Sequence, residues 1–89
     1  SLNDICEALH FSPSYLSRLF KKEMNMTISE FIMQEKIEEA KRLLILSNHT
    51  ILEISSLLHF TDQSYFTKTF KKVTGVTPKV YRNRYKLLS

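Results

Sequence analysis

Residues 64–78, SYFTKTFKKVTGVTP, decide the fold of this chain, because residues 14–27, SYLSRLFKKEMNMT, already carry the same pattern. Aligned over fourteen positions, the two stretches are identical at six, and residues 2–11 match residues 51–60 at four of ten. Each copy reads as a short helix, a tight turn and a longer helix, which is the outline of a helix-turn-helix unit. Two such units do not make a solenoid, so the repeat indicates a pair of similar units.

Start and stop signals divide the chain into six predicted helices and no sheet, so the fold class is all-α. Asn25 and Gly75 are suited to the left-handed conformation that ends helices. In the longer helix of the second unit, the buried stripe should include Val73. In the longer helix of the first unit, it should include Leu19. The residues expected to begin helices are Ser1, Ser12, Thr27, Thr50, Thr61 and Thr77.

The predicted domain organisation places the first helix-turn-helix unit at residues 1–27, a linker helix at 28–47, and the second unit with a C-terminal helix at 48–89. A 20-residue helix is about 30 Å long, and successive major grooves on one face of B-DNA are roughly 34 Å apart. We therefore expect two recognition helices in successive major grooves of an asymmetric site of roughly 20 base pairs. On the linker helix, Glu38 should pair with Arg42.

Charge is unevenly distributed along the chain. Residues 1–62 have a net charge of −3, whereas residues 63–89 contain seven basic side chains and no acid, for a net of +7. Such asymmetry points first to nucleic acid and second to an anionic membrane surface. A single Cys excludes an internal disulfide framework and fits the reducing cytoplasm. No apolar run approaches the length of a membrane span, and the lack of an initial Met predicts a piece of a longer chain.

Each longer helix combines a small polar face near its start with basic residues further along. Small hydroxyl and amide groups can bond base edges, and Lys or Arg can neutralise phosphates, so this combination suits a recognition helix. Any amphipathic helix has a polar face, but that alone does not explain why the same face recurs in two copies. A protein-interaction module that binds no DNA remains the alternative from a different class.

Two stretches, together with the apolar residues of the linker helix, carry a family resemblance: Tyr15–Lys22 and Tyr65-Phe66-x3-Phe70-Lys71-Lys72-x2-Gly75-x-Thr77-Pro78-x2-Tyr81-Arg82. With them, the chain resembles the C-terminal DNA-binding domain of the AraC/XylS family of bacterial transcription regulators. The resemblance covers nearly the whole chain. It implies sequence-specific binding to double-stranded promoter DNA and transcription regulation, often activation through RNA polymerase. It also implies an N-terminal sensor or receiver domain and one further leading helix, absent from this sequence.

Residue roles follow from matching positions to the family. Arg18 suits guanine and Gln63 suits adenine, and Arg82 is alternatively a structural clamp at the domain edge. His59, like His10 in the first unit, stands where the family often has Gly in the turn. Gly there permits a positive φ, which His can adopt at some strain cost. The base-reading positions are Ser14, Ser17, Arg18, Gln63, Ser64, Thr67 and Lys68, and the phosphate positions are Lys21, Lys22, Lys71, Lys72, Arg82 and Arg84.

Other chemistries find little support in the sequence. Cys6 and His10 are spaced as half of a metal site, but structural zinc needs two more ligands. One Gly cannot form a phosphate-binding loop, and the chain offers no nucleophile with a base positioned beside it. We therefore expect no enzyme activity, no metal and no cofactor.

Overall fold

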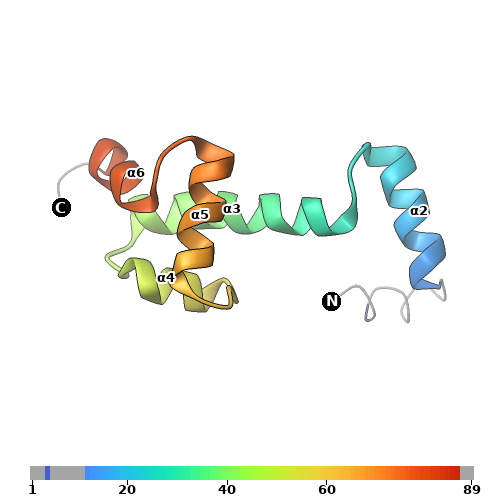
Figure 1. Ribbon diagram of the computed structural model, residues 1–89, viewed down its shortest axis with the longest axis horizontal. Helices are drawn as coiled ribbons and strands as arrows, with labels where there is room; N and C mark the ends of the chain where they lie inside the picture. Colours follow the sequence, from blue (N-terminus) through green and yellow to red (C-terminus); the bar gives the residue numbers. More distant parts are fainter. Residues whose placement is uncertain (1–3, 5–11, 87–89) are drawn as a thin grey trace. The chain divides into compact units, whose positions relative to one another are not determined.

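The computed structural model describes Asp4 and residues 12–86. The described part is helical and contains no strand, which confirms the all-α class (Figure 1). The helix predicted to begin at Ser1 lies outside the described residues. The helices are α2 (Pro13–Met24), α3 (Ile28–Leu46), α4 (Ile51–Leu57), α5 (Gln63–Thr74) and α6 (Pro78–Tyr85).

The chain forms two compact units, Ser1–Gln34 and Glu35–Ser89, and the boundary falls inside α3. In the first unit, the Phe31 ring of α3 lies 5.4 Å from the Phe20 ring of α2. In the second unit, the C-terminal half of α3 contributes three fully buried side chains, Ile37, Ala40 and Leu44. The helix predicted as a linker therefore supplies core residues to both units.

Local capping explains why the helices begin and end where they do. The Ser12 hydroxyl accepts a hydrogen bond from the Tyr15 backbone N–H at 3.1 Å, and α2 ends at Asn25 in the left-handed conformation, φ 57°. Gly75, at φ 89°, ends α5 in the same way. These are the start and stop residues that the sequence predicts.

The capping box predicted at Thr50 is present at the start of α4. The Thr50 hydroxyl accepts from the Glu53 N–H at 3.0 Å, and the Glu53 carboxylate accepts from the Thr50 N–H at 2.8 Å. The bond from the Thr50 backbone N–H is the largest cause of a lowered pKa of Glu53, followed by a hydrogen bond from the Thr50 side chain. Four otherwise unpaired N–H groups begin every helix, and this box satisfies two of them.

Three sequence-based expectations are wrong in detail. Asp62, not Thr61, caps α5, because its carboxylate accepts from the Tyr65 N–H at 2.7 Å. Val73 is 50% exposed and Leu19 37% exposed, so neither belongs to a fully buried stripe. The linker helix predicted at 28–47 also ends one residue early, since α3 stops at Leu46.

The charge pairing on α3 also differs from the prediction. Arg42 Nε donates to the Glu39 carboxylate at 3.0 Å, and Glu38 instead pairs with Lys41 at 2.9 Å. Residues three and four apart are both neighbours on a helix surface, so spacing alone did not select the pair. The hydrogen bond from Arg42 lowers the pKa of Glu39.

The turn between α4 and α5 fixes the angle of the second unit's helix pair. His59 has φ 62°, as its place in the turn predicts, and the Phe60 N–H donates to the Ser55 carbonyl at 3.0 Å. Phe60 packs against Phe66 of α5 with ring centroids 5.0 Å apart. The buried turn residue thus anchors the start of α5 against α4.

An aromatic chain forms the core of the second unit. Phe66 and Phe70 of α5 are fully buried, and their rings are 5.9 Å apart. Phe70 also meets Tyr81 of α6 edge to face at 5.4 Å. Burying a Phe side chain contributes about 1.5–3 kcal/mol, so this row holds α5 with its polar side outward.

Candidate nucleic-acid interface

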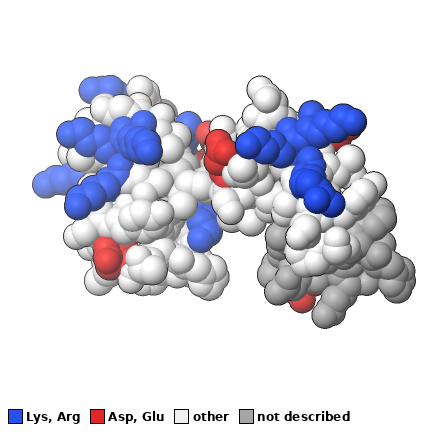
Figure 2. Space-filling model, turned by 45° about the vertical axis from the view of Figure 1, so that its right-hand side comes forward, with Lys and Arg blue, Asp and Glu red and all other residues white. Residues whose placement is uncertain are grey.

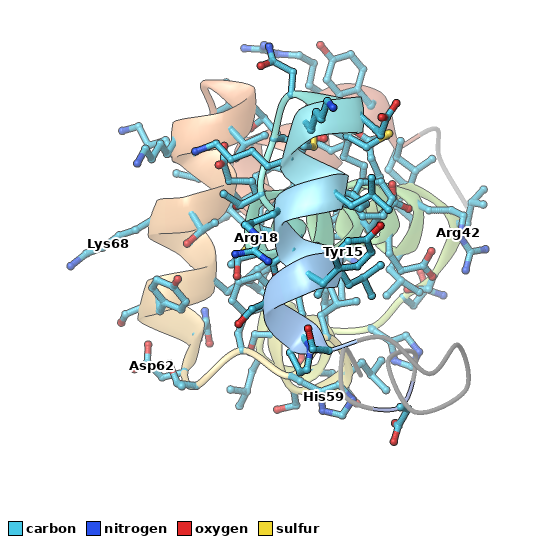
Figure 3. All side chains as sticks on the ribbon, turned by 90° about the vertical axis from the view of Figure 1, so that its right-hand side faces the viewer. Tyr15, Arg18, Arg42, His59, Asp62 and Lys68 are labelled. Carbon is cyan, nitrogen blue, oxygen red and sulfur yellow. The ribbon has the colours of Figure 1, made fainter. Side chains whose placement is uncertain are left out.

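The outward face of α5 carries the residues that the sequence assigns to base reading in the second unit. Gln63, Ser64 and Lys68 are exposed, and Thr67 is half-buried. At about 100° per residue, Ser64 and Lys68 lie on the opposite side of the helix from Phe66 and Phe70. Figure 3 shows Lys68 projecting away from α5, with Asp62 at the start of the helix. The structure therefore brings these predicted residues together on one face.

Lys71 and Lys72 extend this face through the last turn of α5, and both are exposed. Within the described part of the chain, neither they nor Lys68 has a carboxylate within 4.0 Å. Their charges are therefore not neutralised by neighbouring acids. Such cations are available to a polyanion in solution.

The outward face of α2 repeats this arrangement in the first unit. Ser14 and Arg18 are exposed, Ser17 is half-buried, and Lys21 and Lys22 are exposed in the last turn. Arg18 lies on the side of α2 that faces the viewer in Figure 3. The predicted site residues of the first unit thus also share one helix face.

A groove of about 460 Å³ lies between this face and the start of α3. Ser17, Arg18 and Lys21 of α2 line one side, and residues 27–29 and Ile32 line the other. Two of the three side chains from α2 are cationic, so the groove is positively charged along its α2 side.

Figure 2 shows Lys and Arg side chains gathered over the upper part of the visible face of each unit, with acidic side chains both at the lower edges and beside some of the cations. In the second unit, two of the acidic residues are already engaged at helix starts, Glu53 at α4 and Asp62 at α5. Negative side chains at helix N-termini are stabilising. These two carboxylates therefore serve as helix caps in the second unit.

Arg82 and Arg84 differ sharply in their surroundings, although the sequence assigns both to phosphates. Arg82 Nε donates to the Leu44 carbonyl at 3.0 Å, and its Nη2 donates to the Ser47 carbonyl at 3.4 Å. Lys86 also donates to Ser47 and to the Asn48 side chain. The unpaired carbonyls at the end of α3 thereby gain cationic donors. Arg82 has the contacts of the structural clamp, whereas Arg84 is exposed and lies over the Tyr85 ring.

Sequence reasoning missed two exposed aromatic residues and one cation. Tyr15 and Tyr65 are each 47% exposed. Their equivalent positions in the repeat are the signal that could have drawn attention to them. Lys36 lies over the Phe60 ring at 5.2 Å, a pairing between residues distant in sequence that no local pattern indicates.

The described residues contain no group of three or more His, Cys, Asp or Glu side chains that could hold a metal ion. Cys6 and His10, the half-site considered from the sequence, lie outside the described residues. Within the part of the chain described, no helix is both long and apolar enough to cross a membrane.

Comparisons with known proteins agree with this arrangement. A family described as "Helix-turn-helix domain" matches residues 5–84. The chain is 37% identical over 83 residues to the uncharacterized HTH-type transcriptional regulator YobQ of Bacillus subtilis, covering 93% of this chain and 34% of that protein. It is 35% identical over 88 residues to the HTH-type transcriptional activator RhaR of Cronobacter sakazakii, covering 99% and 31% respectively.

Solved structures give the same result. The C-terminal domain of AraT, a response regulator from Geobacillus stearothermophilus, is 32% identical with a TM-score of 0.88, over 100% of this chain and 74% of that chain. The chain spans about a third of the length of the curated relatives YobQ and RhaR. Its sequence, its paired helical units and these relatives agree, and the chain belongs to the AraC-type helix-turn-helix DNA-binding domains of bacterial transcriptional regulators.

Proposed function

We propose that this chain reads a specific duplex DNA sequence with two different recognition helices, α2 and α5, and so directs a longer protein to its promoters. The two helices would enter successive major grooves of an asymmetric site of roughly 20 base pairs. The observation that carries the proposal is the duplicated outward face. In both copies, exposed small polar and basic side chains lie opposite the residues that pack inward.

Base reading would fall to the residues near the start and middle of each face. Arg18 is suited to bidentate bonding with guanine O6 and N7, and Gln63 to adenine N6 and N7. Thr67 offers a methyl group to thymine. The remaining base-reading positions would be Ser14, Ser17, Ser64 and Lys68.

Phosphate contacts would fall to Lys21, Lys22, Lys71, Lys72 and Arg84, which are all exposed. Arg82 is also assigned to phosphate from the sequence. Its main role would be to hold α6 against the end of α3 through its bonds to the Leu44 and Ser47 carbonyls. These cations would set affinity and register on the duplex, and the base contacts would set sequence preference.

The length of α3 supports the proposed spacing of the grooves. Its 19 residues form one continuous helix of about 28 Å, and consecutive major grooves are roughly 34 Å apart. Because the outer faces of α2 and α5 differ in sequence, the two half-sites should also differ. One polypeptide would thereby do what dimeric repressors do with two subunits.

The longer protein would supply the remaining functions of a regulator. The relative RhaR is named as an activator and AraT as a response regulator, so we propose an N-terminal sensor or receiver domain and contact with RNA polymerase. A cytoplasmic location would follow from promoter binding in a bacterium.

Selection of bound sequences from random duplex DNA tests this proposal, with Arg18→Ala as the informative variant. The wild-type chain should enrich an asymmetric sequence with two unlike half-sites. Arg18→Ala should lose about 1–3 kcal/mol of binding free energy and relax preference at one position. Arg18→Ala removes the guanidinium group, which can bond two acceptors of guanine at once.

Lys22→Ala is the matched control, because it removes a cation from the same helix at a phosphate position. It should weaken binding to all sequences about equally and leave the enriched sequence unchanged. The role given to Arg18 is wrong if Arg18→Ala enriches the same bases as the wild type.

A further inference from the structure

Tyr65 has an environment that packing alone does not account for. It is the third residue of α5 and is 47% exposed. One part of the ring meets Phe60 edge to face, with centroids 5.8 Å apart. Phe60 is 8% exposed and is itself held by Phe66, so the Tyr65 ring rests on a fixed support. Among the residues that the structure describes, its hydroxyl group has no hydrogen-bond partner.

The position of Tyr65 on the helix places it beside cations. Lys68 and Lys72 follow it by three and seven residues, so all three side chains lie on one flank of α5. Both lysines are exposed. Ser64, one residue earlier, lies nearer the middle of the outward face. Tyr65 therefore borders the face proposed to read bases.

The flank of a helix lying in the major groove is the part that meets the sugar–phosphate backbone. Neutral hydroxyl groups of Ser, Thr and Tyr make many of the hydrogen bonds to phosphate oxygens, alongside Lys and Arg. A tyrosine can span the distance from the helix flank to the backbone, and its ring loses little conformational freedom because only two torsions are fixed.

The first unit repeats this geometry. Tyr15 is the third residue of α2, is also 47% exposed, and precedes Arg18 and Lys22 by three and seven residues. The same residue type thus occurs with the same exposure, and with basic residues at the same spacings, in two helices of different sequence. A role tied to the outward face explains the recurrence in both copies.

We propose that the Tyr65 hydroxyl donates a hydrogen bond to a DNA backbone phosphate at the edge of the groove occupied by α5. The proposal rests on the proposed function and extends it from the cations to a neutral residue. A phosphate contact of this kind positions the helix and carries no sequence information. It also releases no counterion, because the donor is uncharged.

The Tyr65→Phe variant tests the proposal, since it removes only the hydroxyl and keeps the ring on Phe60. We expect binding about 10- to 100-fold weaker, the usual value of one hydrogen bond to a charged group. The loss should be equal for the selected site and for random duplex DNA. The slope of log affinity against log salt should stay at the wild-type value, whereas Lys72→Ala should make it shallower by about 1.

Tyr85→Phe is the matched control, because Tyr85 is 48% exposed and lies on α6 of the same unit. It should bind as the wild type does, and both Phe variants should unfold at the wild-type temperature. A second measurement uses duplexes with an uncharged methylphosphonate at single positions. At one phosphate, this change should weaken the wild type but leave Tyr65→Phe unaffected.

Three results would overturn the assignment of Tyr65 while leaving DNA binding intact. They are wild-type affinity in Tyr65→Phe, a loss confined to one sequence, and methylphosphonate effects that are the same in both proteins at every position. Absence of salt-dependent DNA binding by the wild type would overturn the proposed function itself, so the two failures are distinguishable.

Discussion

Replacing Phe70 with alanine is expected to lower the free energy of unfolding by about 3–5 kcal/mol. Phe70 is fully buried, and its ring joins Phe66 to Tyr81, so truncation leaves a cavity where α5 meets α6. Such a loss is large for a small domain, whose total stability is about 5–15 kcal/mol. Denaturant unfolding followed by circular dichroism measures it.

Val73→Ala, three residues further along α5, is the matched control. Val73 is 50% exposed, so its truncation should change stability by roughly 0.5 kcal/mol or less. An effect of Phe70→Ala as small as that of Val73→Ala would contradict the view that the aromatic row holds the second unit together.

DNA affinity is expected to fall about a thousandfold as salt rises from about 50 to 200 mM. Neutralising about six phosphates gives a slope of log affinity against log salt near −5. The proposed cations are exposed, and the three lysines of α5 have no carboxylate within 4.0 Å in the described part of the chain. Their charges should therefore be fully available to the DNA. Fluorescence anisotropy across a salt series measures the slope.

Lys71→Ala should reduce the magnitude of this slope by about 1 and weaken binding to every sequence similarly. Lys41→Ala is the control, since Lys41 pairs with Glu38 on α3 and is not a proposed DNA contact. A flat salt dependence of the wild type would instead favour the protein-interaction module.

The fold could be predicted from the sequence because its signals are local. Ser12, Asn25 and Gly75 act within a few residues of themselves, and the structure has each at the predicted helix end. The Thr50 capping box and the positive φ of His59 are likewise set by neighbouring backbone. Periodicity then separates an outward polar side from an inward apolar side on α2 and α5.

Features that depend on competition or on distant contacts could not be predicted. Thr61 and Asp62 both suit an N-cap, and only the finished turn selects Asp62. The partner of Arg42 was ambiguous in the same way, because acceptors lie at two spacings along the helix. In the structure Arg42 bonds Glu39. Arg82 and Leu44 are 38 residues apart, so no local pattern reveals their hydrogen bond.

The residues of the candidate site could be predicted from the sequence more readily than the packing that holds them in place. The polar and basic positions on the outward faces of α2 and α5 follow from helical periodicity and the internal repeat, and their roles in DNA contact stay predictions. Exposure of Tyr65 was not foreseen, because a tyrosine beside two buried phenylalanines reads as part of the core. Its partial exposure depends on the position of Phe60, which the turn at His59 sets.

The most direct test of two recognition helices on one face of the duplex is to insert about 5 base pairs between the half-sites of the selected sequence. This half turn moves one half-site to the opposite face, which α2 and α5 cannot then both reach. The account predicts that affinity falls to the value for a duplex with a single half-site, whereas changing spacer bases without changing length has little effect. Unchanged affinity after the insertion would contradict it.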